Sequence, residues 1–179
     1  MFELRAVLTF VRAAAVTLLV LATLQDTARA QSGWTVTDLG TLPGTVSAGV
    51  ADVNRAGDVV GRSSTAVVGN PDSILRAFLW TSSGGMVDLG TLGSGYSDAS
   101  RINDAGQVVG WADTATGDMH AFLWTAASGM IDLGTLGGQS SYAADINEAG
   151  QIVGTADTPT GTHAFLWTQS GGMIDLGSP

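Results

Sequence analysis

Residues 145–177 have the sequence DINEAGQIVGTADTPTGTHAFLWTQSGGMIDLG, and this stretch decides the fold. Two β-prone apolar runs flank a short polar turn that ends at Gly150, where a bulged hairpin needs a left-handed backbone. An aromatic run follows at residues 163–168, and a last apolar run ends in Asp-Leu-Gly at residues 175–177. Such short β-branched and aromatic runs between turns predict four antiparallel strands.

The same pattern occurs three times along the chain. The Phe-Leu-Trp-Thr run begins at Phe78, Phe122 and Phe165, and the last two copies are separated by 43 residues. Asp-Leu-Gly also occurs once before the first copy, at residues 38–40. We therefore expect a β-repeat domain over residues 31–179, with units of about 44 residues at about 41–90, 91–134 and 135–177, preceded by a strand at 34–40.

The predicted fold class is all-β, because no window after the first 30 residues has a helical period. Four strands in about 44 residues are typical of a β-propeller blade. Propellers usually need at least about four blades, so three blades and one strand leave an incomplete ring. Three alternatives stay open: a homo-oligomer closes the ring, the sheets form an open array, or the chain is a fragment of a longer array.

The first 30 residues have the three parts of a secretory signal peptide. Arg5 and Arg12 supply the positive region, residues 13–24 form an apolar run, and Ala28 and Ala30 are the small residues before a cleavage site. The apolar run has 12 residues, whereas a membrane span needs about 20. We expect residues 1–30 to be a signal peptide, the alternative being an uncleaved anchor. We expect no membrane span after cleavage and an extracellular, cell-surface or periplasmic location.

The remaining chain is acidic and contains no cysteine. It has four arginines, no lysine and 14 acidic residues, which give a net charge of −10. Such a chain lacks the basic stripe that nucleic-acid binding needs. The absence of cysteine excludes disulfides and thiolate metal sites, and an exported chain without disulfides favours a bacterial source.

The repeated motifs resemble those of the HAF-repeat family of extracellular bacterial proteins. The resemblance lies in His-Ala-Phe-Leu-Trp at residues 120–124 and 163–167, in the Asp-Leu-Gly-Thr-Leu-Gly runs, and in the Ile-Asn-x-Ala-Gly-Gln blocks. It covers nearly all of the chain after residue 30. The first unit departs from it, with Arg76 in place of the histidine and Pro43 in place of a glycine. The resemblance implies secretion and a repeated β architecture, and it implies no reaction or cofactor.

Candidate metal ligands occur at the hairpin turns. Asp52 with Asn54, and Asp145 with Asn147, resemble part of a calcium loop. Calcium needs six to eight oxygen ligands, and no closing acid follows either pair. Structural turns explain these residues without an ion, so we expect no cofactor, with calcium as the alternative. The Asp of each Asp-Leu-Gly is likewise expected to accept backbone N–H bonds before the glycine.

Few residues stand outside the repeat. His120 and His163 occupy equivalent positions, where each is expected to bond a neighbouring loop. Trp80, Trp124 and Trp167 are expected in the core. Trp111 has no tryptophan counterpart in the other units, which makes it the candidate ligand contact.

The sequence contains no Gly-x-Ser-x-Gly elbow and no cysteine nucleophile, so we expect no catalytic residues and no enzyme activity. We expect a secreted binding or interaction module for an unknown extracellular ligand or protein, with variable loops at residues 63–75, 113–119 and 157–162. The alternatives are a hydrolase of an extracellular polymer, using acids such as Asp98, Asp104 and Asp145, and a structural assembly subunit.

Overall fold

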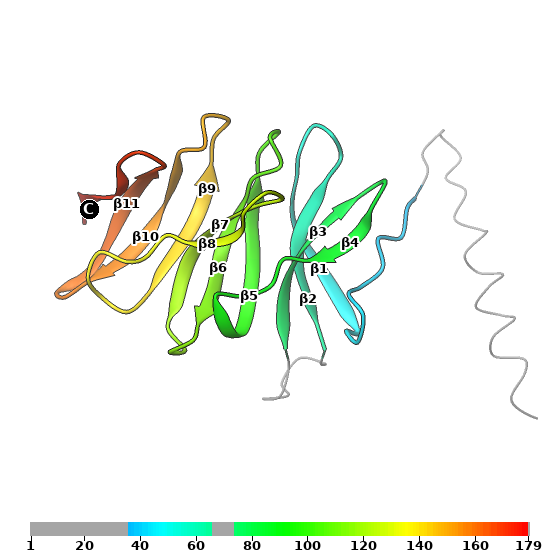
Figure 1. Cartoon of the computed structure of the whole chain (residues 1–179), viewed down its shortest axis with the longest axis horizontal. Helices are drawn as coiled ribbons and strands as arrows, with labels where there is room; N and C mark the ends of the chain where they lie inside the picture. Colours follow the sequence, from blue (N-terminus) through cyan, green and yellow to red (C-terminus); the bar gives the residue numbers. More distant parts are fainter. Residues whose placement is uncertain (1–35, 66–73, 179) are drawn as a thin grey trace, which may run out of the picture. The chain divides into compact units, whose positions relative to one another are not determined.

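A computed structural model describes residues 36–65 and 74–178, and within them the chain forms three four-stranded antiparallel sheets (Figure 1). The first sheet contains β1 (Ser47–Val53), β2 (Val59–Ser64), β3 (Leu75–Thr81) and β4 (Gly85–Asp88). The second contains β5 (Gly93–Ile102), β6 (Val108–Thr114), β7 (Met119–Thr125) and β8 (Gly129–Asp132). The third contains β9 (Ser141–Ile146), β10 (Ile152–Thr158), β11 (Gly161–Thr168) and β12 (Gly172–Gly177). The all-β class and the four strands per unit are confirmed.

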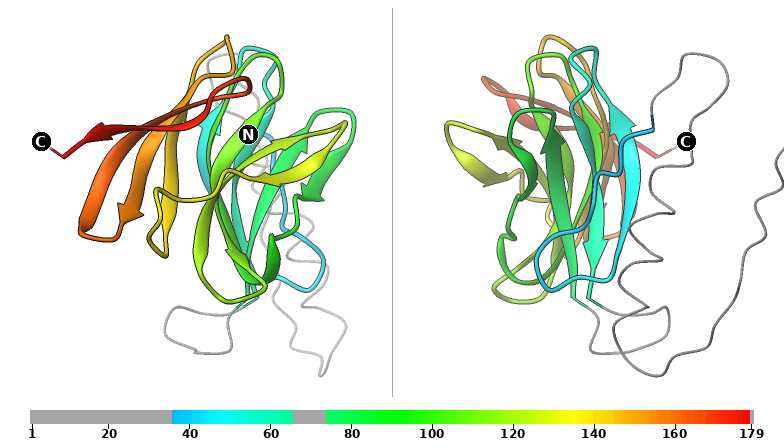
Figure 2. Two further views of the ribbon diagram at one scale, coloured as in Figure 1. Left: turned by 60° about the vertical axis from the view of Figure 1, so that its left-hand side comes forward. Right: turned by 90° about the vertical axis from the view of Figure 1, so that its right-hand side faces the viewer.

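Each sheet is a meander in which consecutive strands pair with one another. The turn between its first two strands is closed by the repeated asparagine, whose carbonyl accepts the amide of the glycine three residues on, as in Asn103 and Gly106. Gly57, Gly106 and Gly150 all have positive φ, as the hairpin pattern predicts. Figure 2 shows the strong twist across each sheet, with β12 (red) crossing the direction of β9 and β10.

Two apolar clusters hold the sheets together face to face. One lies between the first and second sheets, around Val60, Phe122 and Ile102. The other lies between the second and third sheets, around Val109, Phe165 and Ile146. Each packed face of a sheet thus contributes alternate residues of its strands to a core that it shares with the neighbouring sheet. The first strands of neighbouring sheets contact each other, β1 with β5 and β5 with β9, whereas among the described strands β4, β8 and β12 make no comparable contact.

Buried serine hydroxyls join the sheets at two equivalent positions. Ser97 Oγ in β5 accepts the amide of Ala77 in β3 at 2.9 Å, and Ser141 Oγ in β9 accepts the amide of Ala121 in β7 at 2.8 Å. Each of the two serines also donates to the glycine carbonyl of the preceding Asp-Leu-Gly. By strand register Ala48 occupies this position in β1. The second and third sheets, which each pack against a preceding sheet, therefore have the serine at this position, and the first sheet has alanine.

Two expectations concern the start of the chain. The proposed signal peptide, residues 1–30, lies outside the described residues. A strand was expected at 34–40, and residues 36–40 form none. The equivalent segments β4 and β8 do form strands, and each pairs with the third strand of its own sheet. Within the described ranges no helix has the length and apolarity needed to cross a membrane.

Candidate functional site: a cleft between β1 and β5

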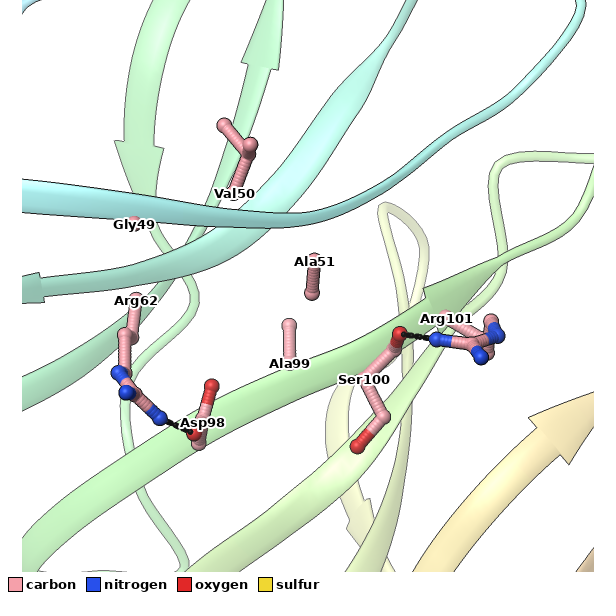
Figure 3. Close-up of a pocket in the computed structure, with 8 residues that line it drawn as sticks. All are labelled: Gly49, Val50, Ala51, Arg62, Asp98, Ala99, Ser100 and Arg101. Carbon is pink, nitrogen blue, oxygen red and sulfur yellow. Dashed lines mark hydrogen bonds and ion pairs between the residues drawn. The ribbon is translucent and has the colours of Figure 1, made fainter.

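A cleft of about 360 Å³ lies where β1 and β2 of the first sheet meet β5 of the second (Figure 3). We call it the β1–β5 cleft. Its wall consists of backbone and small side chains from β1, Arg62 from β2, and four consecutive residues of β5. The lining residues are Gly49, Val50, Ala51, Arg62, Asp98, Ala99, Ser100 and Arg101.

Irregular strand pairing shapes this cleft. The register of β1 against β2 shifts between Val50 and Asp52, and that of β5 against β6 shifts between Ala99 and Arg101. The extra residues at these bulges are Ala51 and Ser100, and both line the cleft. A β-bulge redirects side chains and often lies beside a binding site.

The bulges require glycine in the neighbouring strand. A Cβ on Gly61 would collide with the carbonyl oxygen of Gly49, and one on Gly110 would collide with the carbonyl oxygen of Asp98. Gly154 meets the same obstacle in the third sheet. The glycine that ends each Val-Val-Gly or Ile-Val-Gly run is the sequence signal for this close approach. The sequence does not reveal that the approaching group is a carbonyl of the neighbouring strand.

Two arginines bring positive charge to a strongly acidic chain. Arg62 Nη1 lies 2.8 Å from Asp98 Oδ2, and this ion pair bridges the first and second sheets. Arg101 Nη1 donates to the backbone carbonyl of Ser100 at 2.8 Å, and its Nε lies 3.9 Å from Asp145 Oδ1. The Arg62 and Arg101 side chains are 57% and 47% exposed, and a guanidinium has five N–H donors, so each retains donors that can face a ligand.

The equivalent position between the second and third sheets is aromatic. By register, Trp111 corresponds to Arg62 and Tyr142 to Asp98. Their rings meet edge to face with centroids 6.2 Å apart. Trp111 is half-buried, so its ring combines this contact with a solvent-facing part. The structure places the predicted ligand contact beside Tyr142.

The two histidines pair with the Asp-Leu-Gly aspartates of their own sheets. His120 Nδ1 lies 2.9 Å from Asp132, and His163 Nδ1 lies 2.9 Å from Asp175. The sequence predicted a neighbouring-loop partner and missed this one, which is 12 residues away along the chain. The pairing occupies both histidines outside the β1–β5 cleft, so the hydroxyl of Ser100 has no histidine beside it.

The Asp-Leu-Gly aspartates of the three sheets, Asp88, Asp132 and Asp175, each accept the amide of the glycine two residues on, at 2.7–2.8 Å, as the turn interpretation predicts. In the third sheet this bond from Gly177, followed by the bond from His163, lowers the pKa of Asp175 below its ordinary value of 3.8. Both bonds favour the charged carboxylate.

The candidate calcium ligands make bonds within the protein. Asp52 accepts the amides of Val53 and Ile102, and Asp145 accepts the amide of Ile146. Asn54 and Asn147 each accept the amide four residues on, which closes the hairpin turn. Among the described residues no group of three or more His, Cys, Asp or Glu side chains could hold a metal ion.

The acids considered for hydrolysis are not gathered in the cleft. Asp98 lines it, whereas Asp104 and Asp145 do not. Asp104 is paired with Arg55 at 3.2 Å, and Asp145 faces Arg101.

Two of the expected binding loops are tighter than the sequence suggested. The strands of the second sheet extend to Thr114 and resume at Met119, and those of the third extend to Thr158 and resume at Gly161. The structure therefore corrects the loops at residues 113–119 and 157–162 to short hairpin turns, because threonine hydroxyls bond across them. The loop at residues 63–75 lies partly outside the described residues.

No family model, curated protein or solved structure matches this chain.

Proposed function

We propose that this chain is an exported, non-catalytic binding module of the HAF-repeat kind, in which the three sheets are propeller-type blades. The β1–β5 cleft holds the acidic group of an extracellular ligand. One observation carries this proposal: the cleft gathers polar side chains that the other units do not repeat. They are Arg62, Asp98, Ser100 and Arg101. The polar side chains that do repeat form hydrogen bonds within or between the sheets.

Charge supports an anionic ligand. Arg62 and Arg101 are two of the four arginines that follow residue 30, in a chain with no lysine. A carboxylate or sulfate in the cleft would accept N–H bonds from these guanidinium groups, which present donors in a planar fork. Elsewhere the acidic surface repels such a ligand, so the charge pattern directs it to the cleft.

The contacts between the sheets support the blade interpretation. The first strands approach one another while the fourth strands do not, which is how blades pack around an axis. In that arrangement β1, β5 and β9 line the centre, and the β1–β5 cleft opens toward it.

The test is a comparison of acidic and neutral extracellular polysaccharides by isothermal titration calorimetry. We expect binding of a uronic acid polymer, no binding of its neutral counterpart, and at least tenfold weaker binding by Arg101→Gln. Arg76→Gln is the matched control, because it removes the same charge outside the cleft. Equal loss in both variants would show that net charge, rather than the cleft, attracts the ligand. Release of reducing ends from any polymer would favour the hydrolase alternative.

A further inference from the structure

The outer face of the third sheet exposes apolar side chains that are buried in the other two sheets. Val60 and Val109 occupy equivalent register positions in β2 and β6, and both are 0% exposed under the next sheet. Their counterpart Val153 in β10 is 42% exposed. Leu176 is 58% exposed, whereas its counterparts Leu89 and Leu133 are buried. The third sheet thus presents the face that the first and second sheets each use to bind the sheet that follows.

The opposite face of the first sheet presents the complementary half. Ile102 and Ile146, which receive a preceding sheet, are buried, whereas their counterpart Val53 is 58% exposed. Val50 is 68% exposed, and its counterparts are the buried Ala99 and Ala143. An apolar groove of about 450 Å³ lies there. It is lined by Leu39, Val50, Ala51, Asp52, Val53 and Val59.

We propose that the third sheet of one chain binds the first sheet of a second copy, and that two copies close a ring through two such contacts. The occupant is a second copy because one chain carries both halves of an interface that it already builds twice internally. Val153 enters the groove, as Val60 and Val109 enter the corresponding positions on the second and third sheets. Head-to-tail contacts close into rings when the rotation permits, and six sheets lie within the usual four to eight blades.

Charges at the hairpin turns favour the same contact. Within the chain, Asp104 accepts the amide of Arg55 and pairs with its guanidinium, and Glu148 accepts the amide of Asp104. These equivalent turn residues therefore form a row across the three sheets, in the order Arg55, Asp104 and Glu148. In the proposed contact, Arg55 of the second copy would follow Glu148, and the two side chains have opposite charges. Arg55 is an almost fully exposed side chain, so it can reach a new partner.

Two features make the contact weaker than the internal ones. Ala48 replaces the serine that joins the internal sheets, so the two hydrogen bonds of that hydroxyl are lost. Leu39 lines the groove beside Val50, Val53 and Val59, as Leu89 packs with Ala99, Ile102 and Val108, so Leu176 of the second copy must displace it. Leu39 is only partly buried, so we expect the apolar area that it loses to be regained by Leu176. We therefore expect a reversible dimer.

The test measures the mass of the purified exported protein by light scattering after size exclusion. The wild type should be a dimer, and Val153→Asp and Val50→Asp should each be folded monomers. Ile174→Asp is the control on the same sheet. Ile174 is 44% exposed, and its counterparts Val87 and Ile131 remain exposed although another sheet packs on theirs, so we expect Ile174 to lie outside the contact. A monomeric wild type, a filament, or equal dissociation by Ile174→Asp would overturn the proposal.

A cross-linking experiment determines the direction of the contact. The chain has no cysteine, so Val50→Cys and Val153→Cys each introduce a single thiol. After oxidation of a mixture, the proposal predicts disulfides between the two variants and none within either variant alone. Disulfides between identical variants would show a symmetric contact and refute the head-to-tail arrangement.

Discussion

Removing one hydroxyl group tests whether the buried serines hold the sheets together. Ser141 is fully buried; its Oγ accepts the amide of Ala121 and donates to the carbonyl of Gly134. In Ser141→Ala the buried N–H of Ala121 has no acceptor, whereas the half-buried carbonyl of Gly134 is closer to water. An unsatisfied buried donor costs about 1–3 kcal/mol, so we expect the free energy of unfolding to fall by that amount.

The assay is urea denaturation followed by tryptophan fluorescence, at a fixed protein concentration because any association adds to apparent stability. The matched control is Ser140→Ala, which makes the same chemical change one residue away. The bonds of Ser140 across to Asp157 use its backbone amide and carbonyl, and both survive the substitution. A loss below about 0.5 kcal/mol for Ser141→Ala, or an equal loss for the control, would refute the role assigned to the hydroxyl.

Two further predictions concern the bulges and the aspartates. Gly110→Ala should lower the free energy of unfolding by about 1–3 kcal/mol, because its Cβ meets the carbonyl of Asp98; thermal melting should show no such loss for Gly161→Ala, where a Cβ meets open space. The lowered pKa of Asp175 contributes stability that is present above its ordinary value of 3.8 and is lost as the pH falls through the folded-state pKa. Wild type should therefore exceed Asp175→Asn in stability at pH 7, and the difference should vanish on acidification; a difference independent of pH would contradict this.

Features that depend on neighbours along the chain were predictable from the sequence. The hairpin glycine at Gly150 was one, because a polar turn between two β-prone runs requires a positive φ at that place. The aspartate of Asp-Leu-Gly was another, since its carboxylate reaches an amide only two residues away. Strand 34–40 was predicted by analogy with the later copies, and residues 36–40 form no strand, although they contain the same Asp-Leu-Gly motif.

The candidate site depends on contacts between sheets. Arg62 and Asp98 are 36 residues apart and belong to different repeat units, so their ion pair follows only from how one sheet packs on the next. Trp111 was singled out as a residue without a counterpart, but its contact with Tyr142 requires the same packing.

By itself, the sequence determined the all-β class, the three units and the four strands in each, because turns and alternating apolar residues are local and are repeated three times. Only the tertiary structure decided which faces meet. The repeats have nearly the same apolar pattern, so the pattern cannot distinguish a buried Val109 from an exposed Val153. That difference arises from whether another sheet lies against the face, which is a property of position in the assembly and not of the residue.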